Sequence, residues 1–217
     1  MSSKETYPSS PEALIKNNFM VVISGPTASG KDSIINFFCQ QYPQVHKIVS
    51  YTTRHQRPNE VEGVNYHFIT KTQYMLRRKD LVFETERMID GEIYYYGMDK
   101  NELTPGTCGG ATICSIDLPN LVNLPQILST VFSDTPIQNL SGYVVPIYLG
   151  ANRLTTLKDR YFQRHRVDDE RPVFLSRLRK EWKEWQQFKD VIPHTIINDQ
   201  PLIVAANSIA RLVNELA

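Results

Sequence analysis

A loop that contains glycines and a lysine is the stretch of this sequence best suited to bind phosphate. Gly25, Gly30 and Lys31 match the pattern G-x-x-x-x-G-K, between an apolar run at residues 19–23 and a helical run. In such a loop, backbone N–H groups and a helix N-terminus surround the phosphates, and the lysine reaches the outer ones. A turn without a ligand would need no lysine there. We therefore expect a nucleoside triphosphate to bind at Gly25, Pro26, Thr27, Ala28, Ser29, Gly30, Lys31, Asp32 and Ser33.

The residue after the lysine departs from the usual pattern. Asp32 occupies the position where a serine or threonine normally ligates magnesium, and Ser33 follows it. A carboxylate is a good ligand for Mg²⁺, although it adds negative charge beside the phosphates. We therefore expect Asp32 and Ser33 to be the protein's magnesium ligands.

A second set of polar residues lies between positions 50 and 68. Arg54 and Arg57 are three residues apart, with Ser50 before them and Tyr66 after them. Two guanidinium groups, a hydroxyl and a phenol can converge on one phosphate through charge-assisted hydrogen bonds. This set predicts a second phosphate site that faces the first, and the alternative is a solvated charged turn.

An α/β scaffold is expected to hold the two sets. Apolar runs at residues 19–23, 46–50, 111–116, 144–149 and 194–197 alternate with helical sequence, which predicts about five parallel strands. Short aromatic pieces between residues 51 and 98, with a helix at 71–78, predict an inserted mixed-β subdomain where such sheets bind ligands. Residues 119–142 are long for a connection and receive no assignment. Helical spacing predicts a core stripe made of Phe174, Leu178, Trp182, Trp185 and Phe188.

Composition narrows the possible functions. The 217 residues carry a net charge of +1, which gives no reason to expect binding to nucleic acid or membranes through bulk charge. The three cysteines and five histidines have no metal-ligand spacing, so we interpret them as structural. Residues 1–17 are polar and predict a flexible tail without a signal peptide or membrane span. We expect a cytoplasmic protein, either a monomer or a homodimer.

The second set also carries a family resemblance. The pattern T-T-R-x-x-R-P-x-E-x-x-G-x-x-Y-x-F at residues 52–68, joined to GPTASGK and YYYG, resembles guanylate kinases of the P-loop NTPase superfamily. The resemblance implies a three-layer α/β/α fold with about five parallel strands, an inserted mixed-β subdomain that binds a nucleoside monophosphate, and a helical lid. The domain would span residues 18–217, with a core at 18–50 and 99–217, a GMP-binding insertion at 51–98 and a lid at about 152–176.

The implied activity is ATP-dependent phosphorylation of GMP, with dGMP as a further candidate. ATP would be the co-substrate and Mg²⁺ the cofactor. Lys31, Arg54, Arg160, Arg164 and Arg177 would be catalytic, and Asn198 would lie near the adenine of ATP. The GMP site would contain Ser50, Arg54, Arg57, Tyr66, Glu84, Tyr96 and Asp117.

Two of these implied roles have local alternatives. A carboxylate at Glu84 can accept from both N1–H and the exocyclic amine of guanine, whereas it would face a lone pair on adenine N1. Glu86 is a rival for that role. Arg177 could instead be a helix-surface partner of Glu181, one turn further on.

Departures from the family pattern leave three functions open. Met98 follows YYYG, where the family carries a serine or threonine that donates to guanine O6. The first function is a guanylate kinase with altered selectivity. The second is a related phosphotransferase that uses ribose 1,5-bisphosphate or another nucleoside monophosphate, because GKDS also resembles the loop of ribose bisphosphate phosphokinases. The third is a guanylate-kinase-like module that binds protein and no longer catalyses a reaction.

Overall fold

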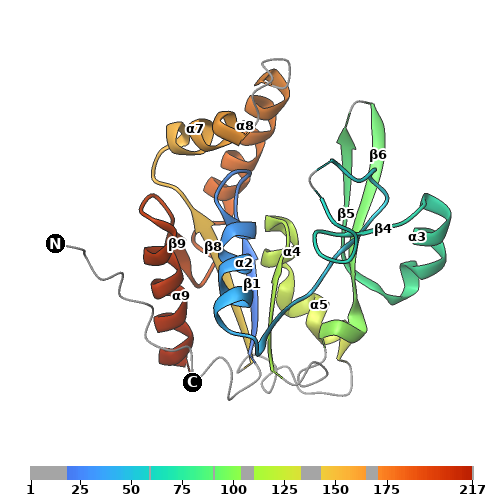
Figure 1. Ribbon diagram of the computed structural model, residues 1–217, viewed down its shortest axis with the longest axis horizontal. Coiled ribbons are helices and arrows are strands. Elements are labelled where there is room, and N and C mark those ends of the chain that lie inside the picture. The colour runs from blue at the N-terminus through green and yellow to red at the C-terminus, as the bar shows by residue number, and fades with distance from the viewer. Residues whose placement is uncertain are drawn as a thin grey trace.

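A five-stranded parallel sheet forms the centre of the molecule (Figure 1). The computed structural model describes residues 19–58, 60–89, 91–103, 110–132, 143–164 and 171–216, without the side chains of residues 164 and 171–173. The strand order is β2–β7–β1–β8–β9, and each neighbouring pair is parallel. The strands are β1 (Met20–Ser24), β2 (Val45–Lys47), β7 (Ala111–Ser115), β8 (Val144–Gly150) and β9 (Thr195–Ile197).

The central strand β1 is buried on both faces, as its uninterrupted apolar sequence predicts. Val21 and Ile23 pack into one hydrophobic cluster, and Met20 and Val22 pack into the other. This alternation follows from the two-residue period of a strand. It allows helices to cover both sides of the sheet.

Different helices cover the two faces. On one face lie α2 (Lys31–Gln41) and α9 (Leu202–Leu216), and on the other lie α4 (Leu118–Val122), α5 (Leu124–Val131) and the end of α8 (Arg171–Phe188). The first part of the unassigned segment 119–142 therefore has a structural role, because Leu121, Leu124 and Leu128 are buried against the sheet. Residues 133–142 of that segment lie outside the described part.

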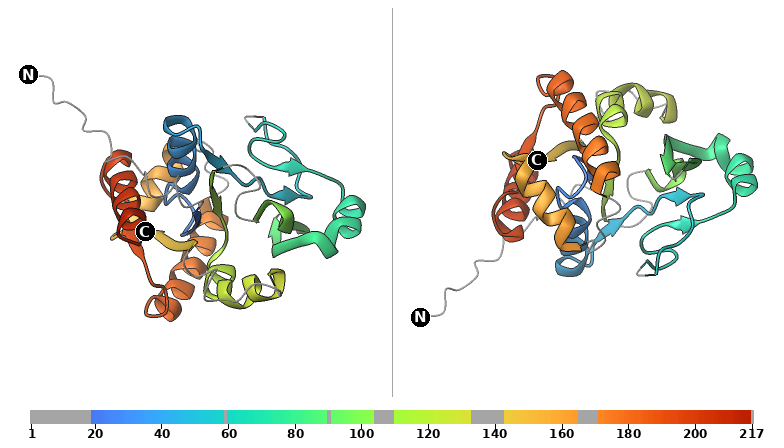
Figure 2. Two further views of the ribbon diagram at one scale, coloured as in Figure 1. Left: turned by 90° about the horizontal axis from the view of Figure 1, so that it is seen from below. Right: turned by 90° about the horizontal axis from the view of Figure 1, so that it is seen from above.

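A smaller mixed sheet lies on the side of the molecule opposite to α9 (Figure 2). Its order is β4–β3–β6–β5, with β3 and β4 parallel and the other pairs antiparallel. Its elements are β3 (Tyr51–Thr52), β4 (His67–Phe68), α3 (Lys71–Arg77), η1 (Arg78–Asp80), β5 (Leu81–Ile89), β6 (Glu92–Asp99) and η2 (Lys100–Leu103). The mixed sheet confirms the predicted insertion into the α/β fold.

Two helices stand above the loop between β1 and α2 (Figure 1). They are α7 (Leu154–Arg164) and α8, which share a small cluster in which Tyr161 stacks on Phe174 with ring centroids 3.7 Å apart. Further along α8, Trp185 stacks on Tyr148 of β8 at 4.1 Å. The predicted aromatic stripe therefore packs inward: Phe174 and Leu178 are buried, and Trp182, Trp185 and Phe188 are partly buried.

The fold class is as predicted, whereas the division into core, insertion and lid stays a prediction. The expected tail at residues 1–17 and the lid loop at 165–170 lie outside the described residues. Cys39 and Cys114 are free thiols. Among the described residues there is no metal-binding group of three or more histidine, cysteine or acidic side chains, and no helix with the length and apolarity to cross a membrane.

Candidate active site

The loop between β1 and α2 has the backbone conformation of a phosphate-binding turn. Gly25 (φ 153°) and Gly30 (φ 96°) both adopt left-handed conformations, and Gly30 is the residue at which α2 begins. A Cβ atom on Gly25 would lie 2.2 Å from the carbonyl oxygen of Leu149, and one on Gly30 would lie 2.6 Å from Nδ2 of Asn198. Both glycines are therefore required by the close approach of neighbouring strands and loops.

Lys31 folds back over this loop. Its Nζ donates to the carbonyl oxygens of Gly25 (2.8 Å) and Pro26 (3.0 Å). Desolvation lowers the pKa of Lys31 from 10.5 to about 8, although the carboxylates of Asp32 and Glu181 act in the opposite direction. The lysine is thus positioned inside the loop, where it can exchange backbone acceptors for phosphate oxygens.

A carboxylate from α8 contacts the same loop. Glu181 on α8 accepts hydrogen bonds from the backbone N–H of Thr27 (2.7 Å) and from its hydroxyl (3.0 Å). The same side chain pairs with Arg177 Nε at 2.9 Å. Burial by itself would raise the pKa of Glu181, but Arg177, the Thr27 N–H and Lys31 outweigh burial and hold that pKa below its usual value.

The Arg177–Glu181 contact bears on both interpretations of Arg177. The helix-surface pair considered as an alternative is present: Arg177 is 45% exposed, while its partner Glu181 contacts the loop after β1. The charge of Arg177 also lowers the pKa of Lys31, so the guanidinium is close to the predicted phosphate site. Sequence reasoning missed the contact between Glu181 and Thr27, because no motif links residues 154 positions apart.

A pocket of about 280 Å³ opens beside the start of α2. Asn198 and Arg160, predicted for the ATP side, both line it, together with Gly30, Ser33, Gln163, Gln200 and Leu202. Asn198 donates from Nδ2 to the carbonyl oxygen of Ser29 (2.8 Å), so the Oδ1 atom of Asn198 takes no part in this bond. This Oδ1 and one terminal nitrogen of Arg160 are buried without a hydrogen-bond partner in the described structure, as expected of a site that awaits a polar ligand. Arg164 lies at the end of α7, and its side chain is outside the described part.

The second predicted phosphate set is assembled around Arg54. This side chain is only 8% exposed and donates to Glu60 Oε1 (2.7 Å) and to the carbonyl oxygen of His55 (2.6 Å). Its guanidinium carbon lies 5.5 Å from the centre of the Tyr66 ring, and Tyr66 packs against Tyr96 at 5.9 Å. The structure therefore brings Arg54, Tyr66 and Tyr96 together.

Two further members of the set lie near it. The backbone N–H of Arg57 donates to Glu60 Oε2 (3.0 Å), while its side chain is exposed. Ser50 is partly buried at the start of β3, and its carbonyl oxygen accepts from the N–H of His67 (2.9 Å). Glu60 therefore occupies an anion position beside the Arg54 guanidinium, where a phosphate could replace it.

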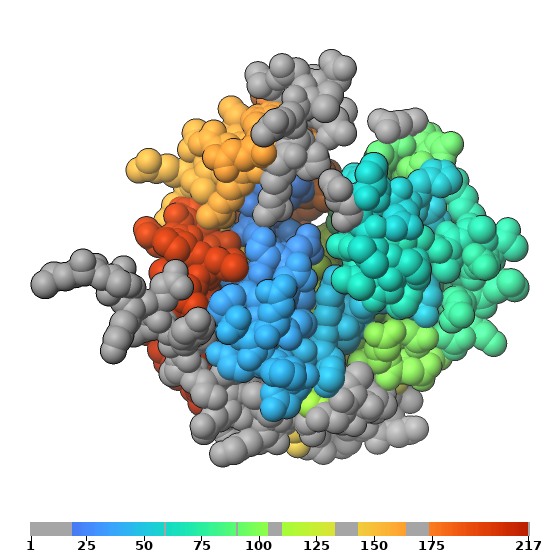
Figure 3. Space-filling view, in the orientation of Figure 1, coloured from blue at the N-terminus to red at the C-terminus, as the bar shows by residue number. Residues whose placement is uncertain are grey.

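The two segments that carry these sets, the loop after β1 with α2 and the chain around β3 and β4, border a hollow in the surface (Figure 3). Burial raises the pKa of Tyr66, and the Asp32 carboxylate adds to this shift, so Asp32 at the phosphate loop lies close to the second set. Arg87 on β5 is a positive group close to both sets. Its guanidinium carbon is 5.5 Å from the Tyr96 ring centre, and its charge lowers the pKa of both Lys31 and Tyr66.

Arg87 was missed by sequence reasoning, and the strand register explains its position. Arg87 pairs with Tyr94, and Thr85 pairs with Tyr96, so Thr85 and Arg87 share one face of the hairpin. Thr85 donates to Asp117, which follows the end of β7 in the central sheet, and this face is therefore the one that looks toward the phosphate loop. Only the alternation of residues along β5 could have signalled Arg87.

The predicted base-contacting carboxylates lie at the root of the hairpin. Glu84 Oε2 accepts from Arg78 Nε at 2.9 Å, and the Tyr74 hydroxyl lies 3.3 Å from the same oxygen. Asp117 caps α4 by accepting from the N–H of Asn120 (3.0 Å). The amide of Asn120 also donates to the backbone carbonyl oxygen of Glu84 (3.3 Å), but the Glu84 carboxylate contacts Tyr74 and Arg78, whereas that of Asp117 contacts Thr85. Glu84 and its rival Glu86 are both exposed, so exposure does not distinguish them.

Known proteins resemble this chain in sequence and in fold. The family model described as guanylate kinase matches residues 17–104. A guanylate kinase of Rhizobium johnstonii is 29% identical over 88% of this chain and 81% of its own length, and one of Chlamydia felis is 27% identical over 92% and 89%. The chloroplastic/mitochondrial guanylate kinase 2 of Oryza sativa subsp. japonica is 32% identical over 57% of this chain.

These matches differ in their extent. The rice match covers 43% of that relative, and a 38% identical match to a guanylate kinase of Clostridium perfringens (strain SM101) covers 41%, so the chain matches less than half the length of these two relatives. The crystal structure of guanylate kinase from Anaplasma phagocytophilum superposes with a TM-score of 0.60 at 19% identity, over 91% of this chain and 85% of that chain. At this identity, the superposition shows a similar fold and no more.

Proposed function

The chain is a homologue of the guanylate kinases, and on this premise we propose that it transfers the γ-phosphoryl group of ATP to GMP. The observation that carries the proposal is the opposition of two phosphate-binding sets. Lys31 belongs to the loop after β1 and Arg54 to the segment after β3, and Arg87 of β5 is near enough to lower the pKa of Lys31. A protein that only bound a triphosphate would need one such set.

Phosphoryl transfer requires positioning and charge neutralisation more than covalent chemistry. In the proposed enzyme, Ser50, Arg54, Arg57, Tyr66 and Tyr96 hold the phosphate of GMP. Lys31 and the loop hold the β- and γ-phosphates of ATP, and Arg160, Arg164 and Arg177 neutralise the transferred group. The acceptor is already a phosphate oxyanion, so no general base is needed.

The adenine of ATP fits the pocket beside α2. Asn198 is held by Ser29 so that its unpaired Oδ1 can accept a hydrogen bond from the 6-amino group of adenine. Guanine carries an acceptor at this position, and two acceptors would then face each other in a buried place. The orientation of Asn198 therefore supports ATP as the donor.

Magnesium fits the residues at the start of α2. Asp32 is an exposed carboxylate whose charge raises the pKa of both Lys31 and Tyr66, so it lies near both proposed phosphate sites. Mg²⁺ binds one or two carboxylates together with substrate phosphates and water, and it would neutralise the phosphate charge here. In this proposal Asp32 is the protein ligand and Ser33 is its neighbour.

The proposal is tested by a coupled ADP-release assay with ATP and Mg²⁺. GMP, dGMP, AMP, CMP, UMP and ribose 1,5-bisphosphate are compared as acceptors, and the Arg54→Met variant serves as the acceptor-site control. We expect turnover with GMP that falls by at least tenfold in Arg54→Met, because a charge-assisted contact is lost. Turnover with a different acceptor would contradict the choice of GMP. Silence with all six acceptors, while nucleotides still bind, would favour the protein-binding module.

A further inference from the structure

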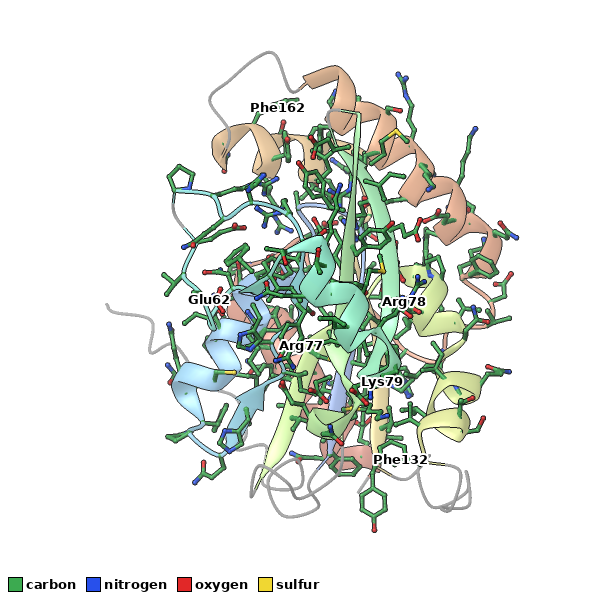
Figure 4. The ribbon with its side chains drawn as sticks, turned by 90° about the vertical axis from the view of Figure 1, so that its right-hand side faces the viewer. Glu62, Arg77, Arg78, Lys79, Phe132 and Phe162 are labelled. Carbon is green, nitrogen blue, oxygen red and sulfur yellow. The ribbon has the colours of Figure 1, made fainter. Side chains whose placement is uncertain are left out.

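The carboxylate of Glu84 lies on the outer face of the mixed sheet. Glu84 Oε2 contacts the hydroxyl of Tyr74 on α3 (3.3 Å) and Nε of Arg78 (2.9 Å), the residue directly after α3. Figure 4 is seen from this outer side, and α3 and Arg78 lie in front of the hairpin strands. The next residue, Thr85, points the other way, because its hydroxyl reaches Asp117 beyond the end of β7. A residue that reads the base on the inner face must therefore be a different one from Glu84.

The inner face carries a hydrogen-bonded cluster made of Thr85, Asp117 and Asn120, here named the hairpin-root cluster. Asn120 of α4 donates from Nδ2 to Thr85 Oγ1 (3.1 Å) and to the backbone carbonyl oxygen of Glu84 (3.3 Å). Thr85 donates from Oγ1 to Asp117 Oδ2. Asp117 Oδ1 accepts from the backbone N–H of Asn120 (3.0 Å). These bonds join the hairpin to the central sheet and hold the three side chains in one arrangement.

The bonds within the hairpin-root cluster leave it with hydrogen-bond acceptors for a ligand. Both amide hydrogens of Asn120 and the hydroxyl hydrogen of Thr85 are donated within the protein. Among the described residues, Asn120 Oδ1 has no hydrogen-bond partner, and each carboxylate oxygen of Asp117 accepts one bond although it can accept two. All three residues are only partly buried, so a ligand can reach these oxygens. A ligand that fits the cluster must therefore supply donors.

The hairpin-root cluster lies beside the proposed site for the acceptor phosphate. Thr85 is paired with Tyr96 across the hairpin, and directly paired residues have Cβ atoms about 5 Å apart on one face. Tyr96 packs against Tyr66, and Arg54 covers the Tyr66 ring. A nucleoside monophosphate is longer than this spacing. A nucleotide whose phosphate binds at these residues can therefore place its base on the cluster.

We propose that Asn120 determines base specificity: its Oδ1 accepts a hydrogen bond from the 2-amino group of the acceptor guanine, while Asp117 accepts from N1–H. Thr85 is a positioning residue, because its hydroxyl orients the Asp117 carboxylate. The inference rests on the proposed function, since it assigns the base contact within the same site. Guanine supplies two neighbouring donors on this edge, whereas adenine would bring the lone pair of its N1 against an acceptor.

The competing explanation is that the hairpin-root cluster only fastens the hairpin to the central sheet. Loss of Asn120 would then weaken the acceptor site as a whole, and every acceptor would be affected alike. A base contact, in contrast, affects only acceptors that carry the 2-amino group. IMP differs from GMP by the absence of that group alone, so the ratio of their kcat/KM values distinguishes the two explanations.

The experiment compares kcat/KM for GMP and IMP in the full chain, with ATP and Mg²⁺ held constant. The unmodified protein should prefer GMP to IMP about tenfold, because IMP leaves the Asn120 oxygen without its donor. In Asn120→Ala this preference should fall to under about threefold, since the acceptor is absent for both nucleotides. Any support that Asn120 gives to Thr85 is lost for both acceptors and cancels in the ratio.

Thr85→Val separates positioning from contact. Valine has a shape close to that of threonine but lacks the hydroxyl that orients Asp117. We expect kcat/KM to fall about three- to tenfold for GMP and IMP alike, because both acceptors carry N1–H. The preference for GMP should stay unchanged. Thr85→Ser keeps the hydroxyl and should retain both values.

Asn101→Ala is the matched control for the loss of an asparagine amide. Asn101 also donates from its side-chain nitrogen to a nearby residue, Asp99 (2.9 Å), but it is exposed in η2. Its replacement should leave both kcat/KM values unchanged. Unfolding in urea shows whether each variant folds, and the preference of the unmodified protein tests the inference without any variant.

The outcomes separate the inference from the function on which it rests. Equal use of IMP and GMP by the unmodified protein would overturn the role of Asn120 while GMP phosphorylation stands. An unchanged preference in Asn120→Ala would do the same and would assign the cluster to fastening the hairpin. A preference altered in Thr85→Val but not in Asn120→Ala would overturn both assigned roles. Absence of GMP turnover in the unmodified protein would overturn the proposed function and this inference together.

Discussion

Replacing Lys31 should abolish turnover and at the same time stabilise the nucleotide-free protein at neutral pH. The pKa of Lys31 falls from 10.5 to about 8 because its ammonium is desolvated. At ~1.4 kcal/mol per pKa unit, the charge costs the folded state roughly 3 kcal/mol. The hydrogen bonds to Gly25 and Pro26 return about 1 kcal/mol each. We therefore expect Lys31→Met to unfold with a free energy about 1 kcal/mol higher at pH 7.

The pH dependence gives this prediction a second, larger signal. Between pH about 8 and 10.5 the unfolded chain keeps its proton on Lys31 while the folded protein loses it, so wild-type stability rises with pH in that window. From pH 7 to pH 9.5 this adds about 2 kcal/mol, at ~1.4 kcal/mol for each of roughly 1.5 units. Lys31→Met lacks this gain. Its advantage at pH 7 should therefore become a deficit of about 1 kcal/mol at pH 9.5, on the same reckoning.

The assay is urea unfolding without nucleotide at the two pH values. Other groups titrate in this range, but they cancel in the difference between the two proteins. Lys180→Met is the matched control. Lys180 is 79% exposed, and its only ion pair in the described part of the chain is a long one, 3.8 Å between Nζ and Glu184 Oε1. It should change the unfolding free energy by less than about 0.5 kcal/mol at either pH. The desolvation of Lys31 would be refuted if the difference in unfolding free energy between wild type and Lys31→Met were the same at pH 7 and at pH 9.5.

Three other predictions concern the charges around the two phosphate sites. Asp32→Ser restores a hydroxyl ligand for Mg²⁺, so kcat should be kept or raised, and a collapse of kcat with intact nucleotide binding would show that the carboxylate is specifically required. Arg87→Met should raise the KM for GMP about tenfold, because a cation beside Tyr96 is lost, whereas Arg77→Met, which removes a similar cover from Tyr51, should not. Glu181→Gln should destabilise the nucleotide-free protein by about 1–2 kcal/mol at pH 7, because charge-assisted bonds to Thr27 and Arg177 are lost. Since the pKa of Glu181 is lowered on folding, urea unfolding should show this difference above the ordinary pKa of 4.5 and its loss as the pH falls further.

The central fold could be predicted because its strands are buried on both faces. Runs such as residues 19–23 are apolar at every position, and each is followed by helical sequence, which few folds other than a parallel α/β sheet accommodate. The helices α4 and α5 were not predicted. Both are short and begin with a proline in the first turn, at Pro119 and Pro125, and a proline there starts a helix as readily as it marks a loop.

The candidate site could be predicted only where its residues are close in the chain. The loop at 25–33 and the set at 50–68 are each local, so their spacing carries the chemistry. The contacts made by Glu181 and Arg87 depend on how a lid helix and a hairpin approach the loop, which no spacing records. The register of β5 is also irregular between Val82 and Thr85, so simple alternation could not decide which carboxylate faces the base.

Each of three cations expected to bind phosphate is held by an oxygen of the protein itself. Lys31 is bound to backbone carbonyls, Arg54 to Glu60, and Arg177 to Glu181. These partners remove the cost of leaving partly buried charges unpaired in the empty protein. A phosphate carries more negative charge than a carboxylate and has more acceptor oxygens, so it can displace them.

The same exchange connects the nucleotide to the lid. Glu181 occupies the N–H of Thr27, which belongs to the phosphate loop, and it lies on α8 above that loop. A triphosphate that takes this N–H must release Glu181 and leave Arg177 free to turn to the phosphate. On the proposed function, we therefore expect binding of ATP and rearrangement of α8 to be coupled through this carboxylate. For this reason Glu181→Gln, although it weakens the empty protein, should bind ATP more tightly than the wild type does, because an amide competes less well than a carboxylate for the loop.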